Sequence, residues 1–478
     1  MAFIWKKFRW KGFLGMSRLP PRYKWILRLV LAVVVSVVVR TIWLVGEREI
    51  DRSAGERALN ETFVATEATD PEWQWDQLNA NRRFPASDKN SAELISRIKS
   101  LMPSDWVHQI NPKQWEPEHS PQSANKRISE STLTAVRREL TIANDAVVLA
   151  RTLKDFPQGN RTITITPDVL STPLQSTADT RVISRLLRWD ALLAASDGKR
   201  ELAADNLIAI LNCSRSVGDE PFLVSQVVRI GARSIAACTL EEVLGKTELS
   251  EKSLAALQEA WLLDADVPLL LNGLRGERAA YDRMLKNLMD GTYTPGSNAN
   301  QPKVDVSFEG YAWWLYRGRL PAERAYYHKY VSAGVAAARL PIHEQMSAIT
   351  ALPALPPAEM KMTCLLLPAV EKVANSYWRS VAEARCIVVA LACERYRLKH
   401  GAWPRQLLDL PKELLQSIPV DPFNAQALRF LHLEEGIMIY STGRDGANDG
   451  IAMSKGLQPV GPRESIRLWD ISQRYTVE

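Results

Sequence analysis

The longest run of apolar positions in the chain lies near its N-terminus, over residues 28–45. It is interrupted chiefly by Arg40, which lies about one helical turn inside Trp43 and can extend its guanidinium toward a membrane surface. Eighteen helical residues span roughly 27 Å, close to the hydrocarbon thickness of a bilayer. Trp25 and Trp43 bracket the run, as expected for interfacial tryptophans. The pattern predicts a transmembrane helix over residues 25–45.

The charges that precede this run predict its orientation. Residues 1–28 carry eight Lys or Arg side chains and no acid, so this tail contributes +8 to a formal net charge of +6 and leaves −2 for the rest. Basic residues flanking an anchor stay in the cytoplasm. We therefore expect the tail, residues 1–24, to be cytoplasmic and the bulk of the chain, beyond about residue 46, to lie outside the membrane.

Two alternatives to an uncleaved anchor agree less well with the sequence. A cleaved signal peptide requires a small-x-small site, and the following "RTIWLVGERE" contains none. A buried helix of a soluble protein would leave the eight basic residues without a role. We predict a single-pass anchor, and no other stretch of the sequence reads as long and apolar enough to span a bilayer.

Composition narrows the classes of function. An apolar fraction of 46% in 478 residues is enough for two or three folded domains. The slightly acidic body lacks the basic surface of a nucleic-acid-binding protein, so no nucleic-acid partner is predicted. Five cysteines lie in apolar, helical contexts without a C-x-x-C pair, which favours buried free thiols. They are Cys213, Cys238, Cys364, Cys386 and Cys393.

Residues 46–125 form a polar, proline-dotted extracytoplasmic segment with short predicted helices. Asn90 or Ser91 is the expected N-cap of one of them. Trp73 and Trp75 could bind a ligand, but we favour their packing against the rest of the domain.

The pattern from residue 126 to 360 is strongly helical. Residues 132–156, "TLTAVRRELTIANDAVVLARTLKDF", predict one amphipathic helix. Proline-rich residues 350–360 are the best internal boundary, because prolines interrupt both helices and strands. Further helices are expected over residues 251–263, 266–290, 321–338 and 363–400.

A helical hairpin is predicted within this domain. Gly198 and Gly218 are placed to end its two helices, and Asp219 is placed to cap a third. Around Gly198 and Ala203 the pattern resembles the second half of a tetratricopeptide repeat, although the aromatic positions of that repeat are missing. We therefore expect a repeat-like array of helical hairpins.

The last part of the chain, residues 361–478, reads as a long helix followed by a compact α+β module. The helix ends before Gly401, and a Trp-Pro turn follows at Trp403. Two β runs, "LRFLHL" and "IMIYST", are joined by a turn containing Gly436, which predicts a hairpin. The overall fold class is thus mainly α, with a small C-terminal α+β module.

Three stretches of this module, "ERYRLKHGAWP", "PVDPF" and "YSTGRDG", give it a resemblance to the periplasmic head of the major pseudopilin of type II secretion (the protein G family). The resemblance covers roughly residues 385–450. It implies a Ca²⁺ ion in the loop after the last strand, with Asp445 and Asp449 as the matching ligands and Asn448 nearby. The alternative is that Asp and Gly simply form a turn there. No other cofactor is predicted.

The chain departs from the pseudopilin pattern in one major respect. A pseudopilin carries its hydrophobic helix immediately before the head, whereas here the apolar run lies more than 300 residues upstream. As a whole, the sequence resembles an uncharacterised family of single-pass proteins anchored in the bacterial inner membrane. That resemblance implies no activity.

Catalytic signatures are incomplete in this sequence. "LGKT" ends like a phosphate-binding loop, but Leu240 stands where the loop's first glycine belongs, so Gly245 reads as a helix C-cap. "HEQMS" begins like a zinc-protease motif, but Ser347 replaces the second histidine. Residues 312–330 are rich in aromatics that could line a peptide or glycan groove, although packing is the simpler role. We assign no catalytic residue.

Three hypotheses about function follow. The first is a non-enzymatic envelope protein, anchored in the membrane, whose helical scaffold binds protein partners that the sequence does not identify. The second is a component or accessory of a type II secretion or pilus-like machine. The third is an exported enzyme whose site forms only on folding.

Overall fold

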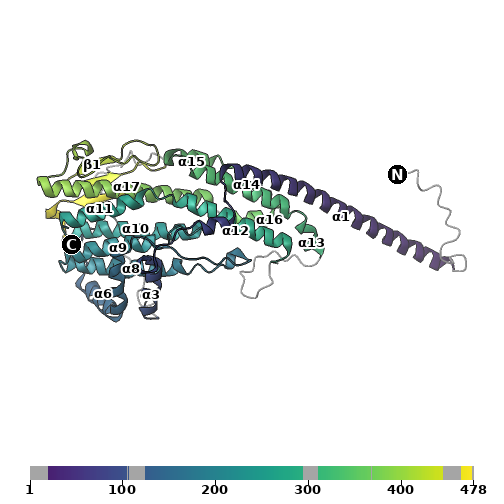
Figure 1. Cartoon of the computed structure of the whole chain (residues 1–478), viewed down its shortest axis with the longest axis horizontal. Helices are drawn as coiled ribbons and strands as arrows, with labels where there is room; N and C mark the ends of the chain where they lie inside the picture. The colour runs from purple at the N-terminus through teal and green to yellow at the C-terminus, as the bar shows by residue number, and fades with distance from the viewer. Residues whose placement is uncertain are drawn as a thin grey trace.

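The computed structural model describes residues 20–104, 106, 124–293, 311–367, 369–444 and 464–475. Within these ranges the protein is mainly helical, with one small three-stranded antiparallel sheet near the C-terminus. The helices form an elongated body, and the first of them projects far beyond one end of it (Figure 1). The predicted fold class is confirmed at this level: mainly α with a small sheet.

The projecting helix is α1, which spans Pro21–Thr69 without interruption. Residues 46–69, expected to be a polar segment with short helices, instead continue this helix and pack along α14 (Leu320–Ala338). Packing on α14 therefore stabilises this half of α1 as a helix, although its polar sequence does not predict a buried face. The helix ends at Asp70 (φ −148°, ψ 72°), where the following Pro71 disfavours helical backbone.

Two short helices, and then two helices separated by a single residue, follow. Asn90 caps the second of them as predicted, with its side chain accepting a hydrogen bond from the amide of Ala92 at 3.1 Å. The single helix expected over residues 132–156 is wrong: the chain breaks at Ala143 (φ −96°, ψ 21°) into two helices. These elements are α2 (Trp75–Ala80), α3 (Ser91–Leu101), α6 (Glu130–Ile142) and α7 (Asn144–Arg151).

The predicted hairpin is formed by α8 (Gln175–Ser196) and α9 (Arg200–Arg215), which pack closely together. Gly198 (φ +72°) and Gly218 (φ +62°) adopt the left-handed conformation that ends each helix, as predicted. The cap predicted at Asp219 is wrong. The next helix begins four residues later, because the side chains of Arg82 and Asn160 hold the Asp219 carboxylate at 2.8 and 2.6 Å.

The remaining helices build the length of the body. They are α10 (Leu223–Lys246), α11 (Glu251–Ala265), α12 (Leu269–Asp290), α13 (Tyr311–Arg317), α14, α15 (Ile342–Thr350), α16 (Lys361–Leu366) and α17 (Val370–His400). Gly401 ends α17 with φ +74°, as predicted. Short 3-10 turns occur at Ser87–Lys89, Thr152–Asp155, Val169–Ser171, Leu407–Asp409 and Ile471–Gln473.

The sheet confirms the predicted hairpin and adds a strand. β1 (Arg429–Leu433) pairs with β2 (Gly436–Tyr440), and β3 (Ser465–Trp469) pairs with the other edge of β2. The third strand was not predicted, since it is separated from β2 by more than twenty residues. The sheet covers the C-terminal half of α17.

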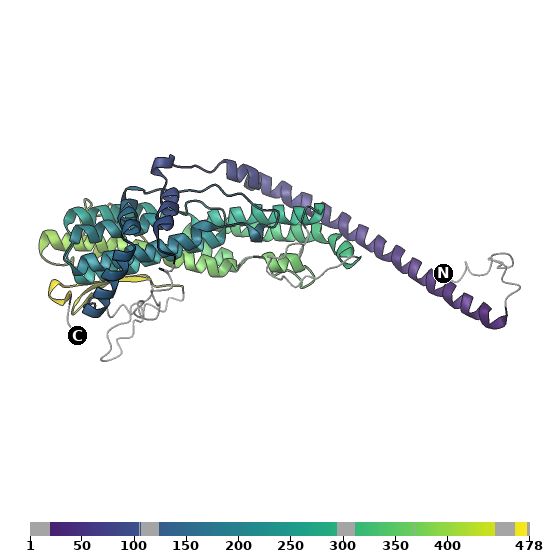
Figure 2. The ribbon, with the colours of Figure 1, turned by 90° about the horizontal axis from the view of Figure 1, so that it is seen from below.

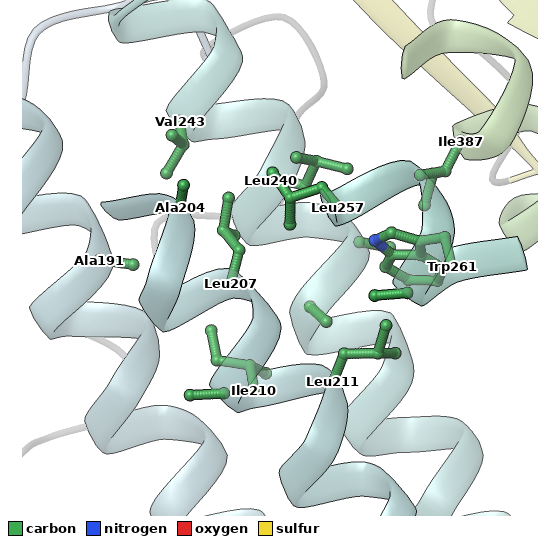
Figure 3. Packing of buried hydrophobic residues seen from close by; sticks show 14 of the residues in the cluster. Ala191, Ala204, Leu207, Ile210, Leu211, Leu240, Val243, Leu257, Trp261 and Ile387 are labelled. Carbon is green, nitrogen blue, oxygen red and sulfur yellow. The ribbon is translucent and has the colours of Figure 1, made fainter. Parts of the chain in front are cut away.

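Two hydrophobic clusters fill the body, and two helices contribute to both. The cluster at the sheet end contains Trp261 and Ile387 (Figure 3), whereas the cluster at the other end contains Trp378. Helix α17 contributes residues up to Ala382 to the second cluster and residues from Ala384 onward to the first. Helix α10 is likewise shared. The residues on both sides of the proline-rich stretch 350–360, Ile349 and Met362, belong to the second cluster, so this stretch does not separate the two clusters.

Candidate functional site at the junction of the N-terminal helix and the body

The first part of α1 is exposed although it is the most apolar segment of the chain. An 18-residue window of this helix has a mean hydropathy of 2.4 and is 0% buried, and Trp25 and Trp43 are 68% and 63% exposed. This helix projects well beyond the body (Figure 2), and by length and composition it could span a bilayer. Helix α10 also passes the same test, contrary to the expectation of a single such stretch. Its window is 67% buried, so it is a core helix of the body.

The second part of α1 packs closely on α14. A side chain at Gly55 would lie 2.6 Å from the backbone nitrogen of Ala322 and 3.1 Å from Cβ of Pro321. Glycine therefore allows the two helix backbones to approach. This contact fixes the direction of α1 relative to the body.

Gly55→Ala is expected to lower the free energy of unfolding by about 1–3 kcal/mol, because the added methyl group forces two backbones apart. Gly46→Ala is the matched control, since no atom lies within 4 Å of that position. Alanine there should be neutral or stabilise the helix by up to about 1 kcal/mol. Thermal unfolding of both full-length variants in detergent measures the difference. Equal melting temperatures would contradict the close approach.

A buried carboxylate clamps the C-terminal end of α1. Asp70 is 3% exposed and contacts three guanidinium groups, those of Arg278, Arg339 and, at 3.0 Å, Arg275. Burial alone would raise the pKa of Asp70, but its hydrogen bonds and charge interactions with the arginines outweigh burial and lower it. Asp70 is thus a charged link between α1, α12 and α14.

His328 and the aromatic residues around it complete this joint. Its ring lies 4.3 Å from the ring of Trp73, and its Nε2 atom is 2.9 Å from Oγ1 of Thr66. Burial, with the nearby Arg278 and Arg324, lowers the pKa of His328 to about 2, so the ring is neutral. Such a histidine packs and does not exchange protons near neutral pH.

The aromatic residues singled out in the sequence mostly pack as well. Trp73 and Trp75 are 3% and 5% exposed, and Tyr327 and Tyr330 are also buried. The packing interpretation is confirmed for these side chains.

Two adjoining cavities follow α1 along the body. One, of about 350 Å³, lies where α1 leaves the body, and the other, of about 730 Å³, continues along α14. Asp51, Arg319 and Glu359 line both. The larger cavity also contains Glu61 and the buried Glu323.

Glu323 is the best-buried acid at these cavities. Burial raises its pKa, although hydrogen bonds from Tyr316 and from the amide and hydroxyl of Thr363 partly oppose the shift. The protein's own groups thus occupy both carboxylate oxygens. This arrangement stabilises the packing of α13, α14 and α16 and leaves little of Glu323 for a substrate.

The predicted calcium ligands Asp445 and Asp449, with Asn448, lie outside the described residues. The two motifs beside that loop do meet. Asp421 of "PVDPF" accepts hydrogen bonds from Ser441 Oγ at 3.0 Å and from the amide of Thr442 at 2.8 Å. Among the residues that the structure describes, no group of three His, Cys, Asp or Glu side chains could hold a metal ion.

Two sequence-based interpretations of single residues are corrected. Gly245 is not a C-cap: it lies inside α10, and a side chain there would meet the carbonyl oxygen of Ala124 at 2.9 Å. Cys364 is exposed on α16, whereas Cys213, Cys386 and Cys393 are buried as expected.

Buried charges inside the body were missed altogether. Asp264, at the end of α11, is fully buried and contacts Arg215, Arg229 and Arg233. A signal was available in the sequence: Arg229 and Arg233 are four residues apart in the largely apolar first part of α10, a spacing that places both on one helix face.

Comparisons with known proteins give no match: neither a protein-family model, nor a curated protein, nor a solved structure is significantly similar to this chain.

Proposed function

We propose that this protein is a membrane-anchored, non-enzymatic scaffold of the bacterial envelope. The observation that carries the proposal is the division of α1 into an exposed apolar part and a part that packs on the body within one unbroken helix. An exposed apolar surface of this size is costly in water and favourable in lipid. The basic tail before it favours a cytoplasmic N-terminus and a body outside the membrane.

The shape of the body supports a role in positioning partners. Because α1 is continuous and is held at Gly55 and Asp70, the body cannot swing freely on a linker. The end that carries the sheet lies opposite the end from which α1 projects (Figure 1). The proposed scaffold would therefore present that end at a fixed distance from the bilayer, and long helix pairs offer extended surfaces for partners.

Val34→Asp combined with Val38→Asp is expected to release most of the protein from the membrane. Each aspartate near the centre of a spanning helix costs roughly 3 kcal/mol on insertion scales. Val64→Asp is the control on the same helix, since Val64 is 72% exposed on the body half. The readout is the fraction remaining in alkali-washed membranes. An unsubstituted chain found free in detergent-free lysate would overturn the anchoring.

A role in a secretion or pilus-like machine is the second candidate. It is supported by the order of α17, Gly401, the Trp-Pro turn and the hairpin, and by the contact of Asp421 with Thr442. Crosslinking in intact cells separates the two proposals. Capture of pseudopilin-like subunits by the end of the body that carries the sheet would support a role in a secretion or pilus-like machine. Other specific partners favour a general scaffold, and the absence of any specific partner contradicts both.

A further inference from the structure

The smaller cavity beside α1 lies at the level where a bilayer would end. It is bounded by Leu44, Glu47 and Arg48 of α1, by α13, and by Lys361 at the start of α16. The apolar run ends at Val45, so Asp51, the last α1 residue in the cavity, lies roughly 9 Å farther along the helix. The polar headgroup layer on each side of a bilayer is roughly 5–8 Å deep, so this stretch of α1 crosses it. Given the proposed anchoring, the cavity opens into the headgroup layer.

The lining of this cavity carries charges of both signs. Arg48, Arg319 and Lys361 provide cations. Glu47, Asp51 and Glu359 provide anions. Its apolar lining is formed by Leu44, which is closest to the apolar run of α1, with Ala312 and Leu315. A ligand that suits this lining has a phosphate, an amine and an apolar remainder pointing along α1 toward the bilayer.

The ion pair of Arg319 is the most easily exchanged of these contacts. Arg319 pairs with Asp51 at 3.4 Å, and their side chains are 52% and 40% exposed. An ion pair between two exposed side chains stabilises a protein little. Arg48, whose side chain is only 14% exposed, pairs with the exposed Glu49. A phosphate that accepts hydrogen bonds from Arg319 can therefore replace the pair with Asp51 at little cost, and Arg48 is held beside it.

Aromatic side chains flank the cavity on the same level. The guanidinium of Arg48 lies 4.2 Å from the centre of the Trp314 ring, and its Nε donates a hydrogen bond to the Trp314 carbonyl at 3.0 Å. Trp313, next in the chain, is half-buried and stacks near Tyr316. Paired tryptophans beside basic groups are typical of membrane interfaces.

We propose that this cavity holds the headgroup of an amine-bearing membrane phospholipid, and that this lipid fixes the body to the bilayer surface. The inference rests on the proposed membrane anchoring. Its phosphate contacts Arg48, Arg319 and Lys361, and its ammonium group contacts the carboxylates of Glu47 and Glu359. The acyl chains descend past Leu44 along the exposed face of α1.

The test uses full-length protein in nanodiscs that contain equal amounts of phosphatidylethanolamine and phosphatidylglycerol. The protein is released gently, and native mass spectrometry counts the retained phospholipid. We expect retained phosphatidylethanolamine in excess of phosphatidylglycerol, and at least a fivefold loss of it in the Arg319→Gln/Lys361→Gln variant. Lys329→Gln is the control, because Lys329 lines the larger cavity, not this one.

Three outcomes overturn the inference. One is that no lipid is retained, and another is that the double variant retains as much as the unsubstituted protein. Equal retention of both lipids contradicts the role of the carboxylates in binding an amine. Failure of the chain to enter nanodiscs at all would instead defeat the anchoring, and the lipid site with it. Matching melting temperatures for all variants show that the fold is intact.

Discussion

Asp264→Asn is expected to destabilise the body by about 3–5 kcal/mol, the cost of breaking a buried ion pair from one side. The Asp264 carboxylate forms ion pairs with three guanidinium groups, those of Arg229 at 2.7 Å, Arg215 at 3.2 Å and Arg233 at 3.3 Å. Burial opposes its ionisation, but the three guanidiniums hold its pKa well below the usual range. Asparagine keeps the shape and removes the charge, which leaves three buried cations without a counter-ion at their centre.

The effect should propagate between helices, because the arginines come from α9 and α10 whereas the carboxylate ends α11. Arg233 also donates to Ser380 of α17 at 2.8 Å. Asp266→Asn, two residues away, is the matched control: its side chain is 67% exposed and pairs with Arg385. It should cost less than about 1 kcal/mol. Urea unfolding of both full-length variants in the same detergent measures the difference, and similar midpoints would contradict the assigned role.

The sequence predicted helix ends and turns correctly where one residue type determines the local backbone conformation. Gly198, Gly218 and Gly401 all adopt positive φ at helix ends, a backbone conformation that residues with a Cβ atom rarely adopt. Asn90 caps α3 because its side chain competes well for free amides. The strands around Gly436 form the predicted hairpin. These features depend on neighbours within a few residues.

The junction could not be predicted, since it depends on residues far apart in the chain. Asp70 meets Arg278 across more than two hundred residues, and Gly55 meets Ala322 across a still longer interval. Nothing near residues 46–69 reveals that α14 will cover them. The failed cap at Asp219 has the same cause, because Arg82, more than a hundred residues away, holds its carboxylate.

Glu383→Gln is expected to make the protein more stable above pH 8 and to leave its stability unchanged near pH 4. Glu383 of α17 lies near Glu241 of α10 and Glu464 at the start of β3, with Arg233 and Arg379 as the neighbouring cations. Burial first, and then the two nearby glutamates, raise the pKa of Glu383 to about 8. Burial and the neighbouring Glu242 raise the pKa of Glu241 to about 7, although the Arg467 amide donates to it at 3.0 Å.

The sign of the pH dependence follows from proton uptake. Between the ordinary carboxyl pKa of 4.5 and about 8, the folded protein holds a proton on Glu383 that the unfolded chain has released. Stability due to this group is therefore full below pH 4.5 and is lost as the pH rises through 8. A shift of this size corresponds to at most about 5 kcal/mol, and we expect about 2 kcal/mol because the side chain is only partly buried.

Chemical unfolding of the full-length protein between pH 4 and pH 9 measures this loss. Glutamine mimics the neutral acid, so Glu383→Gln should flatten the decline by about 2 kcal/mol while the contributions of Glu241 and other groups remain. Glu371→Gln is the control on the same helix, since its side chain is 56% exposed and pairs with Arg444. Parallel profiles of unfolding free energy against pH for Glu383→Gln and Glu371→Gln would contradict this account. Glu383 would then be ionised in the folded protein, and the carboxylates between α10, α17 and β3 would not share a buried environment.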